Sequence, residues 1–511
     1  MEKQTTAKST KKSTTTKKKT VSKTKVEKSE KVVITKKPSV LFVASEANPF
    51  AGTGGLADVI GSLPKSIKAN GEFDVRVVIP LYKDFSTLYR DKLNFLGNFN
   101  VELSWRNQYC GVFTYTYENV IFYFIDNEYY FKRTGLYGFY DDGERFAFFS
   151  KAVLTMMQFL DYYPNVLHAH DWQSALSVVY LKTVYKDLCG YDKIKAFFTI
   201  HNIEYQGKFG GECLGDLFGL DDSFYNIVEY AGCINLMKGA IVCADKVSTV
   251  SPSYAEEIKY DFYSHGLSSI VQTFAFKTLG ILNGIDESVY NPSTDNCLFE
   301  NYGVDDLSGK KTCKRELQKM LGLPEKEDVP VVAVISRLVA HKGLDLLKGI
   351  IHELLSENVQ LVILGKGERQ YEEFFSFISD EYKGKCRTII AYNKDLSSKI
   401  YSGADIFLMP SKQEPCGLSQ MISAKYGAVP VVRKTGGLGD SISPFNKTRD
   451  GGNGFVFENY NAHEMLYVLK DAMYTYQDKE TWSKIIKSAM STDFTWKTSA
   501  EKYQIIYKEL L

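Results

Sequence analysis

The chain has 511 residues, of which 44% are apolar and 24% charged, and it contains no run of about 18 apolar residues that could span a membrane. The net charge is +1, but residues 1–37 carry thirteen lysines and three glutamates, a charge of +10, which leaves −9 for the remainder. We therefore expect a globular protein of two or three domains that does not span a membrane, and its acidic remainder argues against nucleic acid as the main partner.

Residues 1–37 are rich in Lys, Ser and Thr and contain no aromatic side chain. A segment of this composition cannot bury a core, so we predict that it is disordered. A targeting peptide or an anchor to an anionic partner is the alternative. The segment lacks the apolar stretch of a signal peptide and the arginines that organelle presequences favour. We therefore expect a solvated tail and a cytoplasmic protein.

From residue 39 onward, short apolar runs alternate with helical patterns, which predicts a doubly wound parallel sheet. The strands expected in the first half of the chain are residues 39–47, 74–80, 166–172, 195–202 and 246–251. The apolar residues between 56 and 63 fall on one helical face, and Ser251-Pro252 is suited to begin another helix. We predict core and loop packing for the aromatic-rich residues 115–149, and sugar stacking is the alternative.

A domain boundary is predicted near residues 281–292, where Asn-Gly and Asn-Pro dipeptides interrupt the pattern. The strands expected after it are residues 329–336, 358–365, 388–393, 405–410 and 428–433, with 452–457 as an edge strand. Residues 418–426 and 498–511 are predicted to be helical, and the second of these has no strand after it. The expected divisions are a tail at 1–37, α/β domains at 38–282 and 283–491, and a final helical segment at 492–511.

Two similar loops stand near opposite ends of the chain. Thr53-Gly54-Gly55 and Thr435-Gly436-Gly437 each follow a strand-like run and precede a helical pattern with an early acidic residue. Glu414 lies at the carboxyl end of the strand expected at 405–410. Because ligands bind at the carboxyl edges of parallel sheets, and because bare amides at a helix start attract anions, this arrangement suits a sugar joined to a phosphate.

Two cations follow the strand expected at residues 329–336. Arg337 and Lys342 lie at its carboxyl end, where an arginine fork and a lysine ammonium can neutralise a pyrophosphate. Solvation alone is the usual role of surface cations, but the position at a strand end favours phosphate binding.

His168, His170 and Asp171 could suggest a metal site, but no further ligands stand at a suitable spacing, so we predict a polar wall of a cleft instead. His201, after the strand at 195–202, is predicted to form hydrogen bonds in the same cleft rather than to act as a general base. The nine cysteines form no C-x-x-C pair, which predicts reduced thiols without a zinc site or a disulfide framework.

These residues stand in sequence blocks that resemble the bacterial glycogen synthases and plant starch synthases, from about Ser39 to the C-terminus. The blocks are TGGLADV (53–59), HAHDW (168–172), IHNIEYQG (200–207), ADKVSTVSPSYAEEI (244–258), ILNGID (281–286), SRLVAHKGLD (336–345), PSKQEPCGLSQ (410–420) and KYGAVPVVRKTGGLGDSI (425–442). Their joint occurrence in the order of that family is highly specific.

The resemblance implies a GT-B fold, in which two Rossmann-like domains face a deep cleft and a C-terminal helix crosses back to the first domain. It implies transfer of glucose from ADP-glucose to the non-reducing end of an α-1,4-glucan, with retention of the α configuration and without a metal ion or another cofactor. The leaving phosphate itself can assist the acceptor hydroxyl in such a reaction, so the protein chiefly supplies cations and orientation. The residues give no physical reason to prefer adenine over uracil, and UDP-glucose is the alternative donor.

The resemblance also implies roles for individual residues. Glu414, His201, Arg337 and Lys342 would form the catalytic group, in which Arg337 and Lys342 stabilise the diphosphate and Glu414 contacts the glucose. The donor-binding residues would be Gly54, Gly55, Asn283, Cys416, Gly417, Thr435, Gly436, Gly437 and Leu438. Asp58 and Asp171 would lie on the acceptor side.

One position departs from the family pattern. Gly52 stands where the family carries a lysine before Thr-Gly-Gly, and the loss of a charge-assisted contact to the donor costs about 1.5–3 kcal/mol. We expect an active synthase, because Arg337, Lys342, Glu414 and His201 remain. The alternative is a weakened, glucan-binding or scaffolding protein on the same fold. If the lysine pocket survives, Gly52→Lys is expected to strengthen donor binding.

Overall fold

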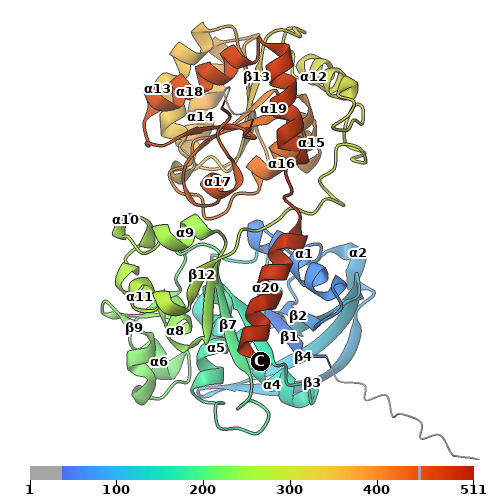
Figure 1. Cartoon of the computed structure of the whole chain (residues 1–511). Coiled ribbons are helices and arrows are strands. Elements are labelled where there is room, and N and C mark those ends of the chain that lie inside the picture. The colour runs from blue at the N-terminus through green and yellow to red at the C-terminus, as the bar shows by residue number, and fades with distance from the viewer. Residues whose placement is uncertain (1–36, 447–450) are drawn as a thin grey trace, which may run out of the picture. The chain divides into compact units, whose positions relative to one another are not determined.

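The computed structural model describes residues 37–446 and 451–511, which contain two large sheets (Figure 1). The predicted tail at residues 1–37 lies outside the described residues except for Lys37. Every strand predicted from an apolar run is present, at the residues given below. The larger sheet belongs to the first half of the chain and the smaller one to the second half, as expected for two Rossmann-like domains. The domain boundaries at residues 282/283 and 491/492 stay a prediction.

The larger sheet has nine strands. In spatial order they are β12 (Thr278–Gly280), β11 (Lys246–Thr249), β7 (Lys195–Ile200), β6 (Val166–His170), β1 (Ser39–Val43), β2 (Asp74–Pro80), β5 (Val120–Asp126), β4 (Arg106–Tyr117) and β3 (Asn94–Leu103). Strands β12 to β5 are parallel, whereas β4 runs antiparallel to both of its neighbours. The predicted doubly wound parallel sheet is confirmed, and β4 and β3 add an antiparallel edge that was not predicted, because β3 is mostly exposed and forms no continuous apolar run.

The smaller sheet is parallel throughout. Its order is β15 (Cys386–Ile390), β14 (Gln360–Gly365), β13 (Val331–Ile335), β16 (Ile406–Met409), β17 (Val429–Arg433) and β18 (Phe455–Phe457). This is the 3-2-1-4-5-6 order of a Rossmann sheet, with its switch point between β13 and β16. The corresponding switch point of the larger sheet lies between β1 and β6. A third sheet of short strands joins β8 (Lys208–Phe209), β10 (Cys233–Asn235) and β9 (Glu229–Tyr230).

Helices connect the strands in both halves. Those of the first half are α1 (Gly55–Ala69), α2 (Thr87–Arg90), α3 (Glu128–Phe131), α4 (Asp142–Phe159), α5 (Trp172–Lys182), α6 (Cys213–Asp216), η1 (Asp222–Phe224), α7 (Tyr225–Val228), α8 (Leu236–Cys243), α9 (Pro252–Glu257), α10 (Asp261–Ser264), α11 (Ser268–Thr273) and η2 (Ala275–Lys277). Those of the second half are α12 (Ser308–Met320), η3 (Ala340–Lys342), α13 (Leu344–Ser356), α14 (Arg369–Glu381), α15 (Lys394–Gly403), α16 (Ser419–Lys425), α17 (Gly436–Ser441), α18 (Ala462–Thr475) and α19 (Lys479–Ser491). No helix of the described residues is long and apolar enough to cross a membrane.

The last helix, α20 (Trp496–Leu510), packs on α1 of the first half (Figure 1). The Gln504 side chain donates to the Ile67 carbonyl (3.0 Å) and accepts from Asn70 (3.0 Å). The Tyr507 hydroxyl lies 2.8 Å from Nδ1 of His168 in β6. The end of the chain therefore crosses back to the first half, as the family resemblance implies.

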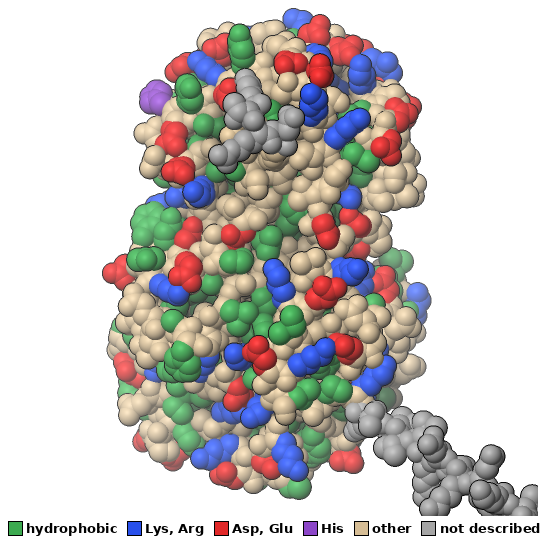
Figure 2. Space-filling model, in the orientation of Figure 1, with side chains coloured by type: hydrophobic (Ala, Val, Ile, Leu, Met, Phe, Trp, Pro, Cys, Tyr) green, Lys and Arg blue, Asp and Glu red, His purple; other side chains and the backbone are tan. Residues whose placement is uncertain are grey.

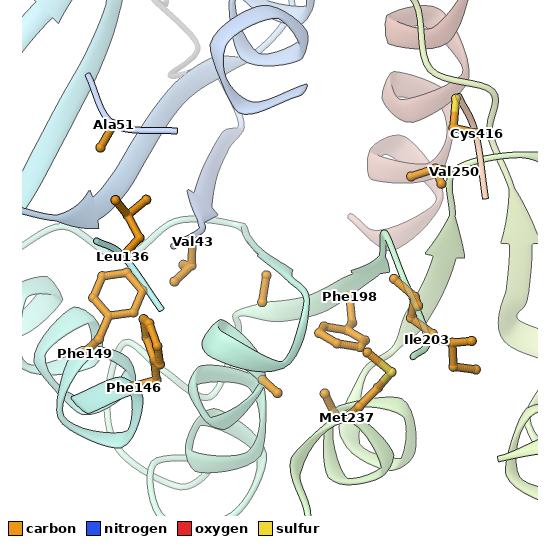
Figure 3. Packing of buried hydrophobic residues seen from close by; sticks show 14 of the residues in the cluster. Val43, Ala51, Leu136, Phe146, Phe149, Phe198, Ile203, Met237, Val250 and Cys416 are labelled. Carbon is orange, nitrogen blue, oxygen red and sulfur yellow. The ribbon is translucent and has the colours of Figure 1, made fainter. Parts of the chain in front are cut away.

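Two separate apolar clusters cover the two faces of the larger sheet. Figure 3 shows Val43, Phe146, Phe149 and Phe198 packed between strands and helices of the first half. The same apolar cluster includes Cys416 of the second half and Val250 of the first half, both labelled in Figure 3. The aromatic residues 115–149 contribute several buried rings, as predicted for core packing, although Tyr129 and Tyr140 are exposed.

Charged side chains of both signs are interspersed over the face of the molecule that Figure 2 draws. All nine cysteines lie in the described residues, and each is a free thiol. In the described part of the chain, no three His, Cys, Asp or Glu side chains are grouped so that they could hold a metal ion.

Candidate functional site

The residues singled out in the sequence collect at the two switch points. Arg337 and Lys342 follow β13, and Glu414 follows β16, which is the strand beside β13. In the first half, the Thr53-Gly54-Gly55 loop follows β1, and Asp171 follows β6 at the neighbouring strand end. Because a crevice forms where the strand order of a parallel sheet reverses, both sets stand where such a fold binds ligands.

Lys342 and Glu414 form a direct ion pair. The Lys342 ammonium lies 2.7 Å from Oε2 of Glu414, which also accepts a hydrogen bond from the Ser411 hydroxyl (3.0 Å). Both side chains are mostly buried, with exposed fractions of 17% for Lys342 and 8% for Glu414. The pair lies beside a cavity of about 10 Å³ lined by residues of β13 and β16, enough for one water. A cation and a carboxylate therefore stand together at the centre of the sheet edge.

Arg337 is exposed, and no carboxylate of the described residues pairs with it. Its nearest polar partner is Nε2 of His341, at 3.5 Å. Burial, followed by the charges of Lys342 and Arg337, lowers the pKa of His341, which favours the neutral imidazole. The Arg337 charge is thus available to an anion at this edge.

The first glycine loop is open. Gly54 and Gly55 are exposed, and a Cβ at either position would meet no atom within 4 Å. No described residue accepts a hydrogen bond from either amide, and α1 starts here without a side-chain cap. The loop is held from below by Glu46, whose Oε2 accepts the Thr53 N–H (2.6 Å) and hydroxyl (2.9 Å). Burial raises the pKa of Glu46 to about 7.

Gly52 precedes this loop and has no room for a side chain. A Cβ at Gly52 would overlap the Cβ of Ala57 and lie 2.9 Å from Oδ1 of Asn48. The Asn48 side chain in turn donates to Oδ1 of Asp58 (2.6 Å). The loop is therefore packed around the glycine, and in this conformation it offers no pocket for a lysine side chain at position 52.

The second glycine loop is closed, unlike the first. The Gly436 N–H donates to Oε1 of Glu257 (2.9 Å), an oxygen that also accepts the Thr435 hydroxyl (3.0 Å). The Gly437 N–H donates to the Glu414 carbonyl (3.1 Å), and the Leu438 N–H donates to the Thr435 carbonyl (3.0 Å). The expectation of bare amides at these three positions is therefore wrong in this conformation, because the protein itself supplies their acceptors.

Glycine is needed at positions 436 and 437 of the second loop for a different physical reason. Gly436 has a φ of +43°, and a Cβ there would overlap the Glu414 carbonyl. A Cβ at Gly437 would overlap the Cys416 carbonyl. The two glycines thus allow the loop to approach the backbone that carries Glu414. Sequence alone does not separate this reason from close approach to a ligand.

His201 is held from two sides at the end of β7. Its backbone N–H donates to Oδ1 of Asp171 (2.7 Å), and its Nε2 lies 3.0 Å from Nδ1 of His170. Burial lowers the pKa of His201 to about 3, so the imidazole is neutral, and it raises the pKa of Asp171 to about 7. Asp171, predicted on the acceptor side, therefore has its carboxylate against the His201 backbone.

His168 does not line a cleft. Its side chain is completely buried, with Nδ1 bonded to Tyr507 of α20 (2.8 Å) and Nε2 to the Thr199 hydroxyl (2.6 Å). The Thr199 hydroxyl in turn forms a hydrogen bond with the Ser248 hydroxyl (2.8 Å). The prediction of a polar cleft wall is wrong for this residue, which links three strands to the last helix.

Asn283 and Cys416 lie against each other below the Glu414 loop. Burial raises the pKa of the Cys416 thiol to about 12, while hydrogen bonds from Asn283 lower it. Oδ1 of Asn283 is buried without a partner among the described residues, which leaves an acceptor for a ligand.

Two further predicted site residues lie near these loops. Gly417 has a φ of +72° and abuts the Gln420 side chain. Burial raises the pKa of Asp58, despite its bond from Asn48.

The sequence patterns missed four residues of this region. Glu46 and Glu257 hold the two glycine loops, His341 stands between Arg337 and Lys342, and Tyr392 follows β15 with its side chain almost fully exposed (94%). The only available signal was position, because Glu46 and Tyr392 each stand near the carboxyl end of a predicted strand. Glu257 gave no signal, since its partner lies 179 residues away in the sequence.

Comparisons with known proteins agree with this geometry. A family described as the starch synthase catalytic domain matches residues 39–273, and one described as glycosyl transferases group 1 matches residues 317–489. A glycogen synthase of Anoxybacillus flavithermus is 47% identical over 92% of this chain and 98% of its own length. One of Bacillus cereus is 45% identical over 93% of this chain and 100% of its own.

Solved structures give the same result. The catalytic domain of starch synthase IV from Arabidopsis thaliana, solved with ADP and acarbose, has a TM-score of 0.87 and 34% identity, and the match covers 93% of this chain and 99% of that one. A sucrose-phosphate synthase of Thermosynechococcus elongatus, with a TM-score of 0.58 and 16% identity over 93% and 99% of the two chains, shares the fold alone. The fold is GT-B, and the chain belongs to the glycogen synthase family of glycosyltransferases.

Proposed function

We propose that this protein transfers glucose from ADP-glucose to the non-reducing end of an α-1,4-glucan, with retention of the α configuration. The observation that carries the proposal is the cluster of Arg337, Lys342 and Glu414 at one switch point. The two cations suit the two phosphates of a sugar diphosphate, and the carboxylate suits the sugar. The relatives are named glycogen synthases, and the plant structure was solved with ADP and acarbose. A cytoplasmic location remains a prediction.

In this proposal, Arg337 and Lys342 bind the two phosphates. Arg337 has no carboxylate partner among the described residues, and the ammonium of Lys342 exchanges part of its contact with Glu414 for the phosphate. The open amides of Gly54 and Gly55, at the start of the 15-residue helix α1, add hydrogen-bond donors from the first half. These groups stabilise the negative charge that the diphosphate gains as it leaves.

Glu414, His201 and Asn283 orient the transferred glucose. Each presents a polar side chain at a strand end or on the connecting segment, and Asn283 has an unpaired acceptor. The bond from C1 of glucose to the diphosphate oxygen breaks, and a bond to the acceptor hydroxyl oxygen forms on the same face. The hydroxyl proton passes to the leaving phosphate, so no protein base needs to remove it.

Tyr392 is our candidate for the nucleoside base. Its ring is almost fully exposed and follows a strand of the sheet that carries Arg337 and Lys342. Stacking of a base on such a ring contributes about 1–3 kcal/mol. Tyr392→Ala should therefore raise the donor KM about tenfold or more, and Tyr392→Phe should leave it unchanged. Because any base can stack, this residue does not choose between ADP-glucose and UDP-glucose.

A second candidate function is glucan binding or scaffolding without turnover, which the packed Gly52 loop favours. To separate the two, the full chain is incubated with glycogen and either ADP-glucose or UDP-glucose while nucleotide release is followed. Turnover with ADP-glucose that Glu414→Ala abolishes supports the synthase. Turnover with UDP-glucose alone would overturn the assignment of ADP-glucose as the donor. Glycogen binding without release of either nucleotide would favour the scaffolding function. A new β linkage in the product would overturn retention.

A further inference from the structure

His170 and His201 share one proton position. Nδ1 of His170 lies 3.0 Å from Nε2 of His201, and the rings are inclined by 38°. A neutral imidazole carries a proton on only one of its two nitrogens. Burial keeps both rings neutral, because it lowers the pKa of each. Therefore either His170 donates to His201 or His201 donates to His170.

The surroundings of His170 make the two arrangements unequal. His170 is completely buried at the end of β6, stacked on Phe42 with ring centroids 5.4 Å apart. Its Nε2 has no hydrogen-bond partner among the described residues. The neighbouring His168 has both of its ring nitrogens engaged, with Tyr507 and Thr199, so it does not serve as that partner.

If His201 donated its Nε2 proton, the proton of His170 would lie on the buried, unpartnered Nε2. An orphaned buried N–H is among the rarest and most costly features of folded proteins, whereas an unpaired acceptor is tolerated better. If His170 donates its Nδ1 proton instead, only a bare acceptor is left at its Nε2. The second arrangement is therefore the more stable one.

We propose that His170 is a positioning residue that fixes the tautomer of His201, so that His201 carries its proton on Nδ1. That nitrogen has no partner among the described residues. His201 then offers an N–H donor, and not an acceptor, to a ligand in front of it. Asp171 supports the arrangement, because its carboxylate accepts the His201 backbone N–H and its own N–H donates to the Thr199 carbonyl (3.0 Å).

The catalytic consequence rests on the proposed function. A donor at Nδ1 of His201 recognises a sugar hydroxyl through one of that hydroxyl's oxygen lone pairs. Loss of the fixed tautomer would remove this neutral hydrogen bond for part of the population. We expect a fall of about 3- to 10-fold in kcat/KM for the donor sugar.

The tautomer is measured directly on the full chain labelled with ¹⁵N at its seven histidines. Nitrogen shifts distinguish a protonated from an unprotonated ring nitrogen, and the His201 signals are assigned by their loss in His201→Gln. We expect wild type to be protonated on Nδ1 of His201. Protonation on Nε2 would overturn the proposal. This readout needs no substrate, so it holds whether or not the glucosyl transfer is confirmed.

Two substitutions of His170 test whether this residue is what fixes the tautomer of His201. Asn places a side-chain N–H near the position of Nδ1, so His170→Asn should keep the tautomer of His201 and most of the activity. His170→Leu removes the donor and should give a mixture of tautomers. His168→Asn is the control for a change in the buried cluster, and it should lower the Tm without moving the His201 proton. An unchanged tautomer in a folded His170→Leu protein would overturn the proposal.

Discussion

Ser253 and Asp440 lie in different halves of the chain, and the Asp440 carboxylate accepts both the backbone N–H (2.8 Å) and the hydroxyl (2.6 Å) of Ser253. Ser253 stands in the first turn of α9, and Asp440 stands in α17. At the other end of the same contact, Glu257 of α9 accepts the Gly436 N–H at the start of α17 (2.9 Å). Each helix therefore supplies a carboxylate to the N-terminal amides of the other, an arrangement we call the reciprocal cap.

The reciprocal cap should contribute measurably to stability. We expect Ser253→Ala and Asp440→Ala to lower the Tm, and a double-mutant cycle to give a coupling of about 1–2 kcal/mol, because the bonds are charge-assisted but half-buried. Glu256→Gln is the matched control on α9, since its exposed pair with Lys259 should contribute less than about 0.5 kcal/mol. Additive effects of the two single substitutions would show that the contact does not join the halves.

The pairing of Lys342 with Glu414 predicts opposite effects on ADP binding. Glu414→Gln releases Lys342 from its carboxylate partner, so this variant should bind ADP at least as tightly as wild type while transferring glucose far more slowly. Lys342→Gln removes the ammonium itself and should weaken ADP binding about 10- to 100-fold. Calorimetric titration with ADP and steady-state kinetics measure the two effects.

Lys434→Gln is the control for that comparison. Its ammonium pairs with Glu458 in an exposed ion pair next to the second glycine loop, so neither ADP binding nor turnover should change. If Glu414→Gln weakens ADP binding as much as Lys342→Gln does, the two residues act as one structural unit, and the assignment of Lys342 to the phosphates fails.

The sequence predicted all six strands of the smaller sheet and five strands of the larger one (β1, β2, β6, β7 and β11), but not the contacts between the halves. Strands such as β17 are buried on both faces and therefore read as continuous apolar runs, and the residues that follow them gather at one edge. By contrast, β3 carries Asn and Gly in an exposed edge strand and gives no such run. The bond from Gly436 to Glu257 joins residues far apart in the chain, and no local pattern encodes it.

Glu46 should make stability depend on pH near neutrality. Because its folded-state pKa is raised from 4.5 to about 7, the folded state holds the proton more tightly than the unfolded state. The stability that this provides is complete below about pH 4.5 and is lost as the pH rises through about 7, a change of about 3 kcal/mol. Glu46→Gln does not titrate.

The measurement is the difference in Tm between wild type and Glu46→Gln at pH 5 and at pH 8. Asp171 also has a raised pKa and is present in both proteins, so it cancels from the difference apart from the smaller part of its shift that the Glu46 charge causes. We expect the variant to gain several degrees relative to wild type on going from pH 5 to pH 8. A difference that is independent of pH would mean that the bonds from Thr53 keep the Glu46 pKa near its ordinary value.

Gly52 gives a prediction in which geometry replaces the expectation from the family pattern. A Cβ at this position overlaps that of Ala57, which lies in α1 and does not rotate away. Gly52→Lys should therefore lower stability by about 1–3 kcal/mol and should not raise kcat/KM, although the added ammonium is close to a loop with open amides. Gly52→Ala carries the same Cβ without the charge, so any difference between the two variants reports the ammonium alone.

In the Ala57→Gly background the overlap is removed at a cost of about 1 kcal/mol in α1, and there Gly52→Lys should bind ADP more tightly than Gly52→Ala does. A single Gly52→Lys variant that melts like wild type and turns over faster would show instead that the loop yields to the side chain and that the family's lysine pocket persists.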